Sequence, residues 1–231
     1  MLVYGRNVAS ELLLNNKNLV KKIYLQDGFD DKELISLIDK SNISYKFITK
    51  NDMNRLANGV HQGIILDVLD YKYYDLNDIS LDDNFIVMLD HIEDPHNLGA
   101  IIRTCVAAGV QYIIIPKDRS VSVNSTVFKT SAGLVLKSKI IEVSNLSNAI
   151  RFLKEKGFWI YSSAMDGESY FNTDFSDKCC LVIGNEGKGV SSLIRKNSDF
   201  IISIPIKSSV DSLNASVAAG ILIYGVVRNR G

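Results

Sequence analysis

Short apolar segments alternate with amphipathic segments along most of the chain, and this alternation predicts an α/β protein. In the first 70 residues, apolar residues at helical spacing predict helices around 8–14 and 31–41. Runs rich in β-branched and aromatic residues predict strands at 22–27, 45–49 and 63–68. This part of the chain is therefore expected to form a small α/β domain.

The remainder of the chain is richer in continuously apolar runs. Strands are predicted at 85–90, 112–116, 139–143, 159–164, 180–184 and 200–205. Helical patterns separate several of them, as at 145–157. Strands without polar alternation are typical of a parallel sheet covered by helices on both faces. A doubly wound α/β domain is therefore predicted here.

The segment between these two regions, 71–84, has no periodicity and holds four Asp against one Lys. Such a composition is typical of an exposed connection between domains. We therefore expect a domain at 1–70, a linker at 71–84 and a second domain at 85–231.

Composition excludes a disordered or fibrous protein, and the charge balance excludes a chain that is basic throughout. Hydrophobic residues make up 46% of the chain and charged residues 23%, as in ordinary globular proteins. Lys and Arg together number 26, as do Asp and Glu, so any surface for nucleic acid must be a local patch. A cluster of basic residues that face a single acid could form such a patch. It comprises Lys117, Arg119, Lys129, Lys137 and Lys139.

Other features bear on location and cofactors. The first residues lack the uninterrupted apolar stretch of a signal peptide. The longest nearly apolar run, 213–227, is shorter than the roughly 20 residues that span a bilayer. We therefore expect a cytoplasmic protein without a membrane partner. The three cysteines contain no C-x-x-C pattern, so neither a disulfide framework nor a zinc site is predicted.

Polar and glycine-rich segments follow three of the predicted strands. They are "HIEDPHNLGAIIRT" after 85–90, "NEGKGVSSL" after 180–184 and "IKSSVDSLNASVAAG" after 200–205. Ligands collect at the carboxyl ends of parallel strands, so the three segments together predict one site. Each has a plainer interpretation when taken alone: Asn97 suits a helix N-cap and Gly184 a turn. "GNEGKG" matches neither the Walker nor the dinucleotide pattern, which makes a nucleotide hydrolase improbable.

Arg103 lies on the helix predicted after the first of these strands. The apolar stripe of that helix consists of Leu98, Ile101, Ile102, Cys105 and Ala108. Arg103 points away from this stripe, so it is a candidate for contact with a ligand.

The three segments resemble, in the same order, the motifs of the SpoU, or TrmH, family of RNA ribose 2′-O-methyltransferases in the SPOUT superfamily. "VYGRNVASELLL" and "VHQGIILDV" in the first 70 residues also resemble the small ribosomal-protein-like substrate-binding domain of some members. The resemblance implies a trefoil-knotted α/β domain with a mainly parallel sheet, and a homodimer. The final helix is apolar on nearly all sides, which suits burial in a core and a subunit interface.

The resemblance also implies the activity, which is transfer of a methyl group from S-adenosylmethionine to a ribose 2′-hydroxyl of RNA. The chain is most similar to members that methylate a guanosine in 23S ribosomal RNA. Two alternatives stay open. One is a tRNA ribose 2′-O-methyltransferase, and the other is a non-catalytic, ribosome-associated RNA-binding protein.

The family's functional residues fall on matching positions of this chain. The catalytic set is Asn97, Arg103, Glu186, Ser212 and Asn214. The set that binds the methyl donor is Ala164, Gly184, Asn185, Ile204 and Leu213. The expected RNA contacts are Arg103, Lys117, Arg119 and Lys129, and no metal is expected. Because an arginine is effectively always charged, Arg103 is expected to grip a phosphate and stabilise the developing alkoxide rather than act as a free base.

Overall fold

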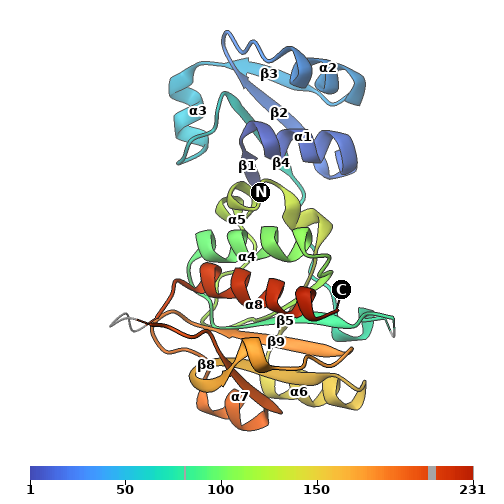
Figure 1. Ribbon diagram of the computed structural model, residues 1–231. Helices are drawn as coiled ribbons and strands as arrows, with labels where there is room; N and C mark the ends of the chain where they lie inside the picture. The colour runs from blue at the N-terminus through green and yellow to red at the C-terminus, as the bar shows by residue number, and fades with distance from the viewer. Residues whose placement is uncertain (81, 208–211, 231) are drawn as a thin grey trace. The chain divides into compact units, whose positions relative to one another are not determined.

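The computed structural model describes residues 1–80, 82–207 and 212–230, and the chain forms two compact units (Figure 1). Unit 1 comprises Met1–Lys72 and Val123–Leu136, and unit 2 comprises Tyr73–Ser122 and Lys137–Gly231. The segment 123–136 therefore packs with the N-terminal residues, whereas the sequence pattern placed it within a domain at 85–231.

Unit 1 contains a four-stranded sheet in the order β1-β4-β2-β3. The strands are β1 (Leu2–Tyr4), β2 (Val20–Gln26), β3 (Tyr45–Ile48) and β4 (Ile64–Val68). Strand β4 is antiparallel to β1 and β2, and β3 is parallel to β2. The helices are α1 (Arg6–Asn15), α2 (Lys32–Ser41), α3 (Lys50–Leu56) and α5 (Ser125–Thr130). The sequence pattern predicted neither β1 nor α3, which are too short to show periodicity.

Unit 2 contains a six-stranded sheet in the order β10-β8-β9-β5-β6-β7. Its strands are β5 (Phe85–Asp90), β6 (Tyr112–Pro116), β7 (Lys139–Val143), β8 (Trp159–Ser169), β9 (Cys179–Gly184) and β10 (Phe200–Ser203). Every pairing in this sheet is parallel. The prediction of an α/β fold built on a parallel sheet is therefore confirmed.

Helices cover both faces of this sheet, because its central strands are apolar on both sides. All six residues of β5 are buried. In Figure 1, α4 (Pro95–Ala107) and α8 (Ala215–Arg230) lie on one face of β5 and β9, and α6 (Leu146–Glu155) and α7 (Ser192–Asn197) lie on the other. Ile86 and Met88 of β5 pack in one core with Leu153 of α6.

The segment 71–84 is only partly the exposed connection that its composition suggested. The backbone N–H of Tyr74 donates to the carbonyl of Ile140 at 2.9 Å. Ile79 follows the short 3₁₀ helix η2 (Leu76–Asp78) and is buried in the core of unit 2. The hydroxyl of Tyr112 donates to the carbonyl of Asp78. The segment from Tyr74 to Ile79 is thus anchored to unit 2 by two hydrogen bonds to its backbone and by the burial of Ile79, which composition does not reveal.

Strand β8 extends to Ser169, beyond the predicted 159–164. Its pairing with β10 is interrupted at residues 163–167, which we call the excursion of β8. Ile201 of β10 pairs with Ser162, whereas the next residue, Ile202, pairs with Glu168. Residues 163–167 therefore leave the ladder and return to it. A Cβ on Gly167 would lie 2.7 Å from backbone atoms of Ile201 and Ile202, so the return requires glycine.

The final helix, α8, begins two residues later than the apolar run 213–227 and extends to Arg230. Its buried side chains are Ala215, Ala219, Leu222, Ile223 and Val226. Val217 and Tyr224, by contrast, are each 50% exposed. Within the described ranges, none of the helices combines the length and the apolar character that a membrane span needs.

Candidate functional site

The first polar segment forms the start of α4, directly after β5. Asp94 is the N-cap, and its Oδ1 accepts the backbone N–H of His96 at 2.9 Å. Pro95 follows at the first helical position, where its missing N–H costs nothing. Asn97 was an N-cap candidate in the sequence, but it lies within the first turn because Asp94 takes the cap. The residue is 6% exposed, and its Nδ2 donates to Oδ2 of Asp94 at 3.4 Å, which leaves the amide able to donate a second hydrogen bond.

Glu186 joins the three polar segments. Its Oε1 accepts hydrogen bonds from Nδ2 of Asn97 and, at 2.8 Å, from Nδ2 of Asn214. Asn97 comes from α4, Glu186 from the loop after β9, and Asn214 from the segment before α8. Oδ1 of Asn214 also accepts the backbone N–H of Ser216 at 3.0 Å. Three members of the predicted catalytic set are thus brought together.

The loop after β9, residues 185–190, is fixed to the end of β5. Nδ2 of Asn185 donates to the carbonyl of His91 at 2.9 Å. Further along, the backbone N–H of Ser191 donates to Oδ2 of the buried Asp90 at 2.7 Å. A Cβ on Gly184 would lie 2.1 Å from the carbonyl carbon of Gly189. The loop can therefore fold back over the end of β9 only if residue 184 is glycine.

A cavity of about 480 Å³ opens beside this loop, and we call it the apolar cavity. All five residues predicted to bind the methyl donor line it, namely Ala164, Gly184, Asn185, Ile204 and Leu213. Glu186 and Ser212 of the predicted catalytic set line it as well. Apolar side chains such as Val190, Ile202 and Leu222 form much of the remaining wall.

The excursion of β8 supplies another part of the wall, and an ion pair holds it. One nitrogen of Arg195 donates to Oδ1 and Oδ2 of Asp166 at 2.8 and 2.7 Å. This contact lowers the pKa of Asp166 below its usual range. Both residues line the apolar cavity, so the Arg195 charge there is already neutralised.

Arg103 lies apart from these contacts. Its side chain is exposed on α4 and has no hydrogen bond or ion pair to the described residues. It does not line the apolar cavity, and neither do Asn97 and Asn214. The structure therefore brings Asn97, Glu186 and Asn214 together, places Glu186 and Ser212 at the cavity, and leaves Arg103 facing solvent.

The predicted RNA contacts fall into different parts of the chain. Lys117 and Arg119 are exposed directly after β6 in unit 2. Lys129 belongs to unit 1, where its Nζ donates to Oε1 of Gln62 at 2.9 Å. Burial lowers the pKa of Lys129. Lys139 is likewise engaged, because its Nζ donates to the hydroxyl of Tyr112 at 2.8 Å.

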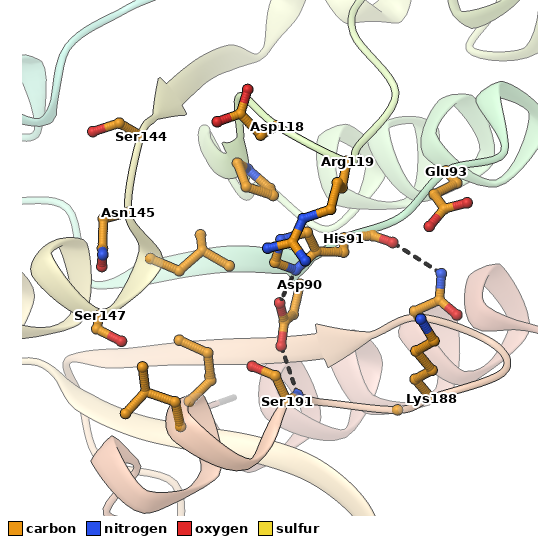
Figure 2. Close-up of a pocket in the computed structure, with 16 residues that line it drawn as sticks. Asp90, His91, Glu93, Asp118, Arg119, Ser144, Asn145, Ser147, Lys188 and Ser191 are labelled. Carbon is orange, nitrogen blue, oxygen red and sulfur yellow. Dashed lines mark hydrogen bonds and ion pairs between the residues drawn. The ribbon is translucent and has the colours of Figure 1, made fainter.

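A second cavity, of about 440 Å³, lies at the carboxyl ends of β5 and β6 (Figure 2). We call it the polar cavity. It shares three lining residues with the apolar cavity, namely Asn185, Lys188 and Gly189. Among its other lining residues is His91, whose Nδ1 contacts Oδ1 of Asp90. Sequence reasoning did not single out His91, although its position directly after a strand of the predicted site edge was a usable signal.

The comparisons with known proteins agree on one family. Residues 84–224 match the family model described as SpoU rRNA Methylase, and residues 2–74 match the model for RNA 2′-O ribose methyltransferase substrate binding. The 23S rRNA (guanosine-2′-O-)-methyltransferase RlmB of Escherichia coli K12 is 36% identical over 239 residues, which span 99% of this chain and 98% of RlmB. YacO of Bacillus subtilis, named for the TrmH family of tRNA/rRNA methyltransferases, is 36% identical over 99% of this chain and 95% of its own length.

Among solved structures, the SpoU methyltransferase AviRb from Streptomyces viridochromogenes, in complex with AdoMet, superimposes with a TM-score of 0.84. The match covers 100% of this chain and 90% of AviRb. At 23% sequence identity, this likeness concerns the fold.

Proposed function

Because the chain belongs to the SpoU rRNA methylase family, we propose that it methylates the 2′-hydroxyl of a guanosine ribose in 23S ribosomal RNA. Its activity is the transfer of a methyl group from S-adenosylmethionine to a ribose 2′-hydroxyl of RNA. The choice of 23S ribosomal RNA is supported by the 36% identity to RlmB over almost the whole of both chains. The observation that carries the site assignment is the convergence of three polar segments on Glu186 beside the apolar cavity.

The residues of the apolar cavity fit S-adenosylmethionine. Its volume of about 480 Å³ lies within the range of small-molecule sites, and its wall is largely apolar with a few polar groups, as such sites require. The carboxylate of Glu186 at the cavity suits a ligand that carries positive charge. We infer that Ala164, Gly184, Ile204 and Leu213 hold the donor, with Asn185 on the same loop.

The bound donor supplies an electrophilic methyl group on a sulfonium centre, so the protein's task is to position the ribose hydroxyl and help it lose its proton. We assign Arg103 to grip an RNA phosphate and to stabilise the developing alkoxide, because its guanidinium is charged and has no partner in the described chain. Glu186 positions the loops by accepting from Asn97 and Asn214. Ser212, which lines the cavity, contributes a hydroxyl to the same site.

RNA binding is assigned to both parts of the chain. The domain at 1–70 overlaps the substrate-binding family match at 2–74, which supports a role in RNA recognition. The domain at 85–231 would carry the chemistry, with 71–84 joining the two. Lys117, Arg119 and Lys129 are proposed to contact the RNA backbone, which is recognised largely through its negative charge.

We further propose that the protein acts as a homodimer in the cytoplasm. Support for the dimer comes from α8, where the side chains of Val217 and Tyr224, which are seven residues apart and so lie on one face of the helix, are each 50% exposed. An exposed apolar surface of this kind is typical of a protein interface. The trefoil knot implied by the resemblance stays a prediction.

Methyl transfer to defined RNA tests this function. The protein should transfer labelled methyl groups from S-adenosylmethionine to unmethylated 23S ribosomal RNA, and mapping should place the modification on a guanosine ribose. Arg103→Ala should abolish transfer and retain donor affinity, whereas Arg151→Ala, which removes an exposed arginine on α6, should retain both. Transfer to tRNA alone would replace the proposed substrate. Full activity of Arg103→Ala would remove Arg103 from the mechanism.

A further inference from the structure

The polar cavity is built from the strand ends of unit 2. Asp90 ends β5, Pro116 ends β6, and Asn145 precedes α6, which follows β7. Since the carboxyl ends of parallel strands meet at one edge, these residues converge without any contribution from unit 1. The volume of about 440 Å³ lies within the roughly 300–1,000 Å³ of small-ligand sites.

Hydrogen-bond donors without protein partners face this cavity. Arg119 and Lys188 line it, and neither side chain has a hydrogen bond or ion pair to the described residues. Figure 2 shows the Arg119 guanidinium extending toward Asp90 and His91, and the Lys188 side chain on the 185–190 loop. Oδ1 of Asn145 caps α6 by accepting the backbone N–H of Asn148 at 3.0 Å, which leaves its amide nitrogen for a ligand. These groups favour a ligand that is rich in acceptors, such as a phosphodiester.

The rest of the wall indicates more than an isolated anion. Glu93 and Asp118 also line the cavity, together with Asp90, whose oxygens already contact His91 and the Ser191 N–H, and carboxylates are unfavourable beside a simple phosphate. A nucleobase, by contrast, carries N–H donors that carboxylates accept, and a flat face that packs on apolar side chains. Leu146, Leu193 and Ile194 supply such a surface. Cations, carboxylates and an apolar surface together match the parts of a nucleotide.

The position of the cavity relates it to methyl transfer. Asn185, Lys188 and Gly189 line both cavities, so the 185–190 loop separates the polar cavity from the proposed donor site. The bonds from Asn185 to His91 and from Ser191 to Asp90 hold this loop against the end of β5. A ligand in the polar cavity therefore contacts the same loop as the methyl donor.

We propose that the polar cavity binds one unpaired nucleotide of the substrate RNA, with a phosphate at the two cations and the base on the apolar surface. Sequence-specific recognition of RNA commonly uses such splayed-out bases. The proposal rests on the proposed function, because it takes RNA as the substrate. A basic patch would contact only the phosphates of the RNA. The proposal also assigns a binding site for a base, formed by residues at the ends of β5 and β6 and at the start of α6.

Two variants separate the phosphate contact from the base contact. Arg119→Gln removes a cation from the cavity, and Ser147→Phe fills the cavity without changing its charge. The matched controls are Lys196→Gln, an exposed cation of α7 that does not line the cavity, and Ser147→Ala, which removes the hydroxyl without adding volume. Each full-length variant is first checked for unchanged S-adenosylmethionine affinity by calorimetry.

Equilibrium binding to transcribed, unmethylated 23S ribosomal RNA is then measured by filter binding at several salt concentrations. Arg119→Gln should weaken binding about tenfold and reduce the log–log salt slope by about 0.7–0.9, as expected for one lost phosphate contact. Ser147→Phe should weaken binding by a similar factor, about tenfold, with an unchanged slope, because a base contact releases no counterions. Both controls should match the wild-type protein.

Several results would overturn the proposal. Affinities of both variants within about twofold of their controls would remove the cavity from RNA binding. A reduced salt slope for Arg119→Gln, with normal binding by Ser147→Phe, would show a surface cation and no occupied cavity. Because binding is measured without methyl transfer, these outcomes are independent of the proposed activity. Wild-type methylation of tRNA instead of 23S ribosomal RNA would change the proposed substrate, and the same comparison would then be made with that tRNA.

Discussion

Replacing Glu186 by alanine should loosen the contact between the first turn of α4 and the segment before α8. In the folded protein, Oε1 of Glu186 accepts hydrogen bonds from the side-chain amides of Asn97 and Asn214. Glu186→Ala removes this acceptor. The Asn97 side chain is 6% exposed, so water replaces the lost acceptor poorly. Asn214 is exposed and can bond to solvent instead.

The magnitude follows mainly from Asn97. Nδ2 of Asn97 keeps its long bond to Oδ2 of Asp94, at 3.4 Å, and loses the bond from its other N–H. A buried N–H left without an acceptor costs about 1–3 kcal/mol, and the exposed Asn214 adds little. For a chain of 231 residues, each kcal/mol corresponds to about 2–4 °C in melting temperature, so Glu186→Ala should melt about 2–12 °C below the wild-type protein. Glu186→Gln keeps a carbonyl acceptor and loses only the charge assistance. It should therefore melt between the two.

Differential scanning calorimetry at neutral pH measures this series, with Glu155→Ala as the control for loss of an exposed acid on α6. The control should melt with the wild-type protein. Equal melting temperatures for Glu186→Ala, Glu186→Gln and the wild-type protein would refute the reasoning, because the amide of Asn97 would then not depend on Glu186.

The remaining predictions concern the loop, a buried histidine and the thiols. Gly184→Ala should weaken S-adenosylmethionine binding at least about tenfold in calorimetry, because its Cβ would lie 2.1 Å from backbone. Gly220→Ala should bind normally, because its Cβ would have nothing within 4 Å and Gly220 does not line the apolar cavity. Burial, and then the Lys50 charge, lower the pKa of His61 from 6.5. Melting temperature should therefore fall as the pH drops below about 6.5, and His61→Gln should flatten that fall; parallel curves would contradict this role. Burial raises the pKa of the Cys179 thiol to about 12, so a thiol reagent at pH 8 should modify the native protein slowly and the denatured protein fully; rapid modification of the native protein would count against this burial.

The parallel sheet could be predicted because its signal is local. The first five residues of β5 are apolar and the sixth is Asp90, and all six are buried. The sequence pattern and the burial pattern therefore coincide. The same holds for β6, where Tyr112–Pro116 are buried without exception. Strands that are covered on both faces show no polar alternation, and few other structures produce such runs.

The site contacts could not be predicted in the same way, because they depend on residues far apart in the sequence. Asn97 and Glu186 are 89 residues apart, and a hydrogen bond between them needs both strand ends in place. Because Asp94 is the N-cap, the amide of Asn97 can donate to both Asp94 and Glu186, yet both residue types suit a cap equally well. The excursion of β8 at 163–167 likewise depends on its pairing with β10.

The 185–190 loop explains why two cavities of different character lie next to each other. Asn185, the first residue of the loop, donates to the carbonyl of His91. Ser191, the residue that follows the loop, donates its backbone N–H to Asp90. Asp90 and His91 are the last residue of β5 and the one that follows, so one strand end holds the loop at both of its ends. Gly184 allows the backbone of Gly189 to approach closely, so the loop folds back over the end of β9 between its two fixed ends. In the proposed function this loop would stand between the methyl donor on one side and the nucleotide on the other, and positioning is the main task of a protein whose methyl donor is already activated.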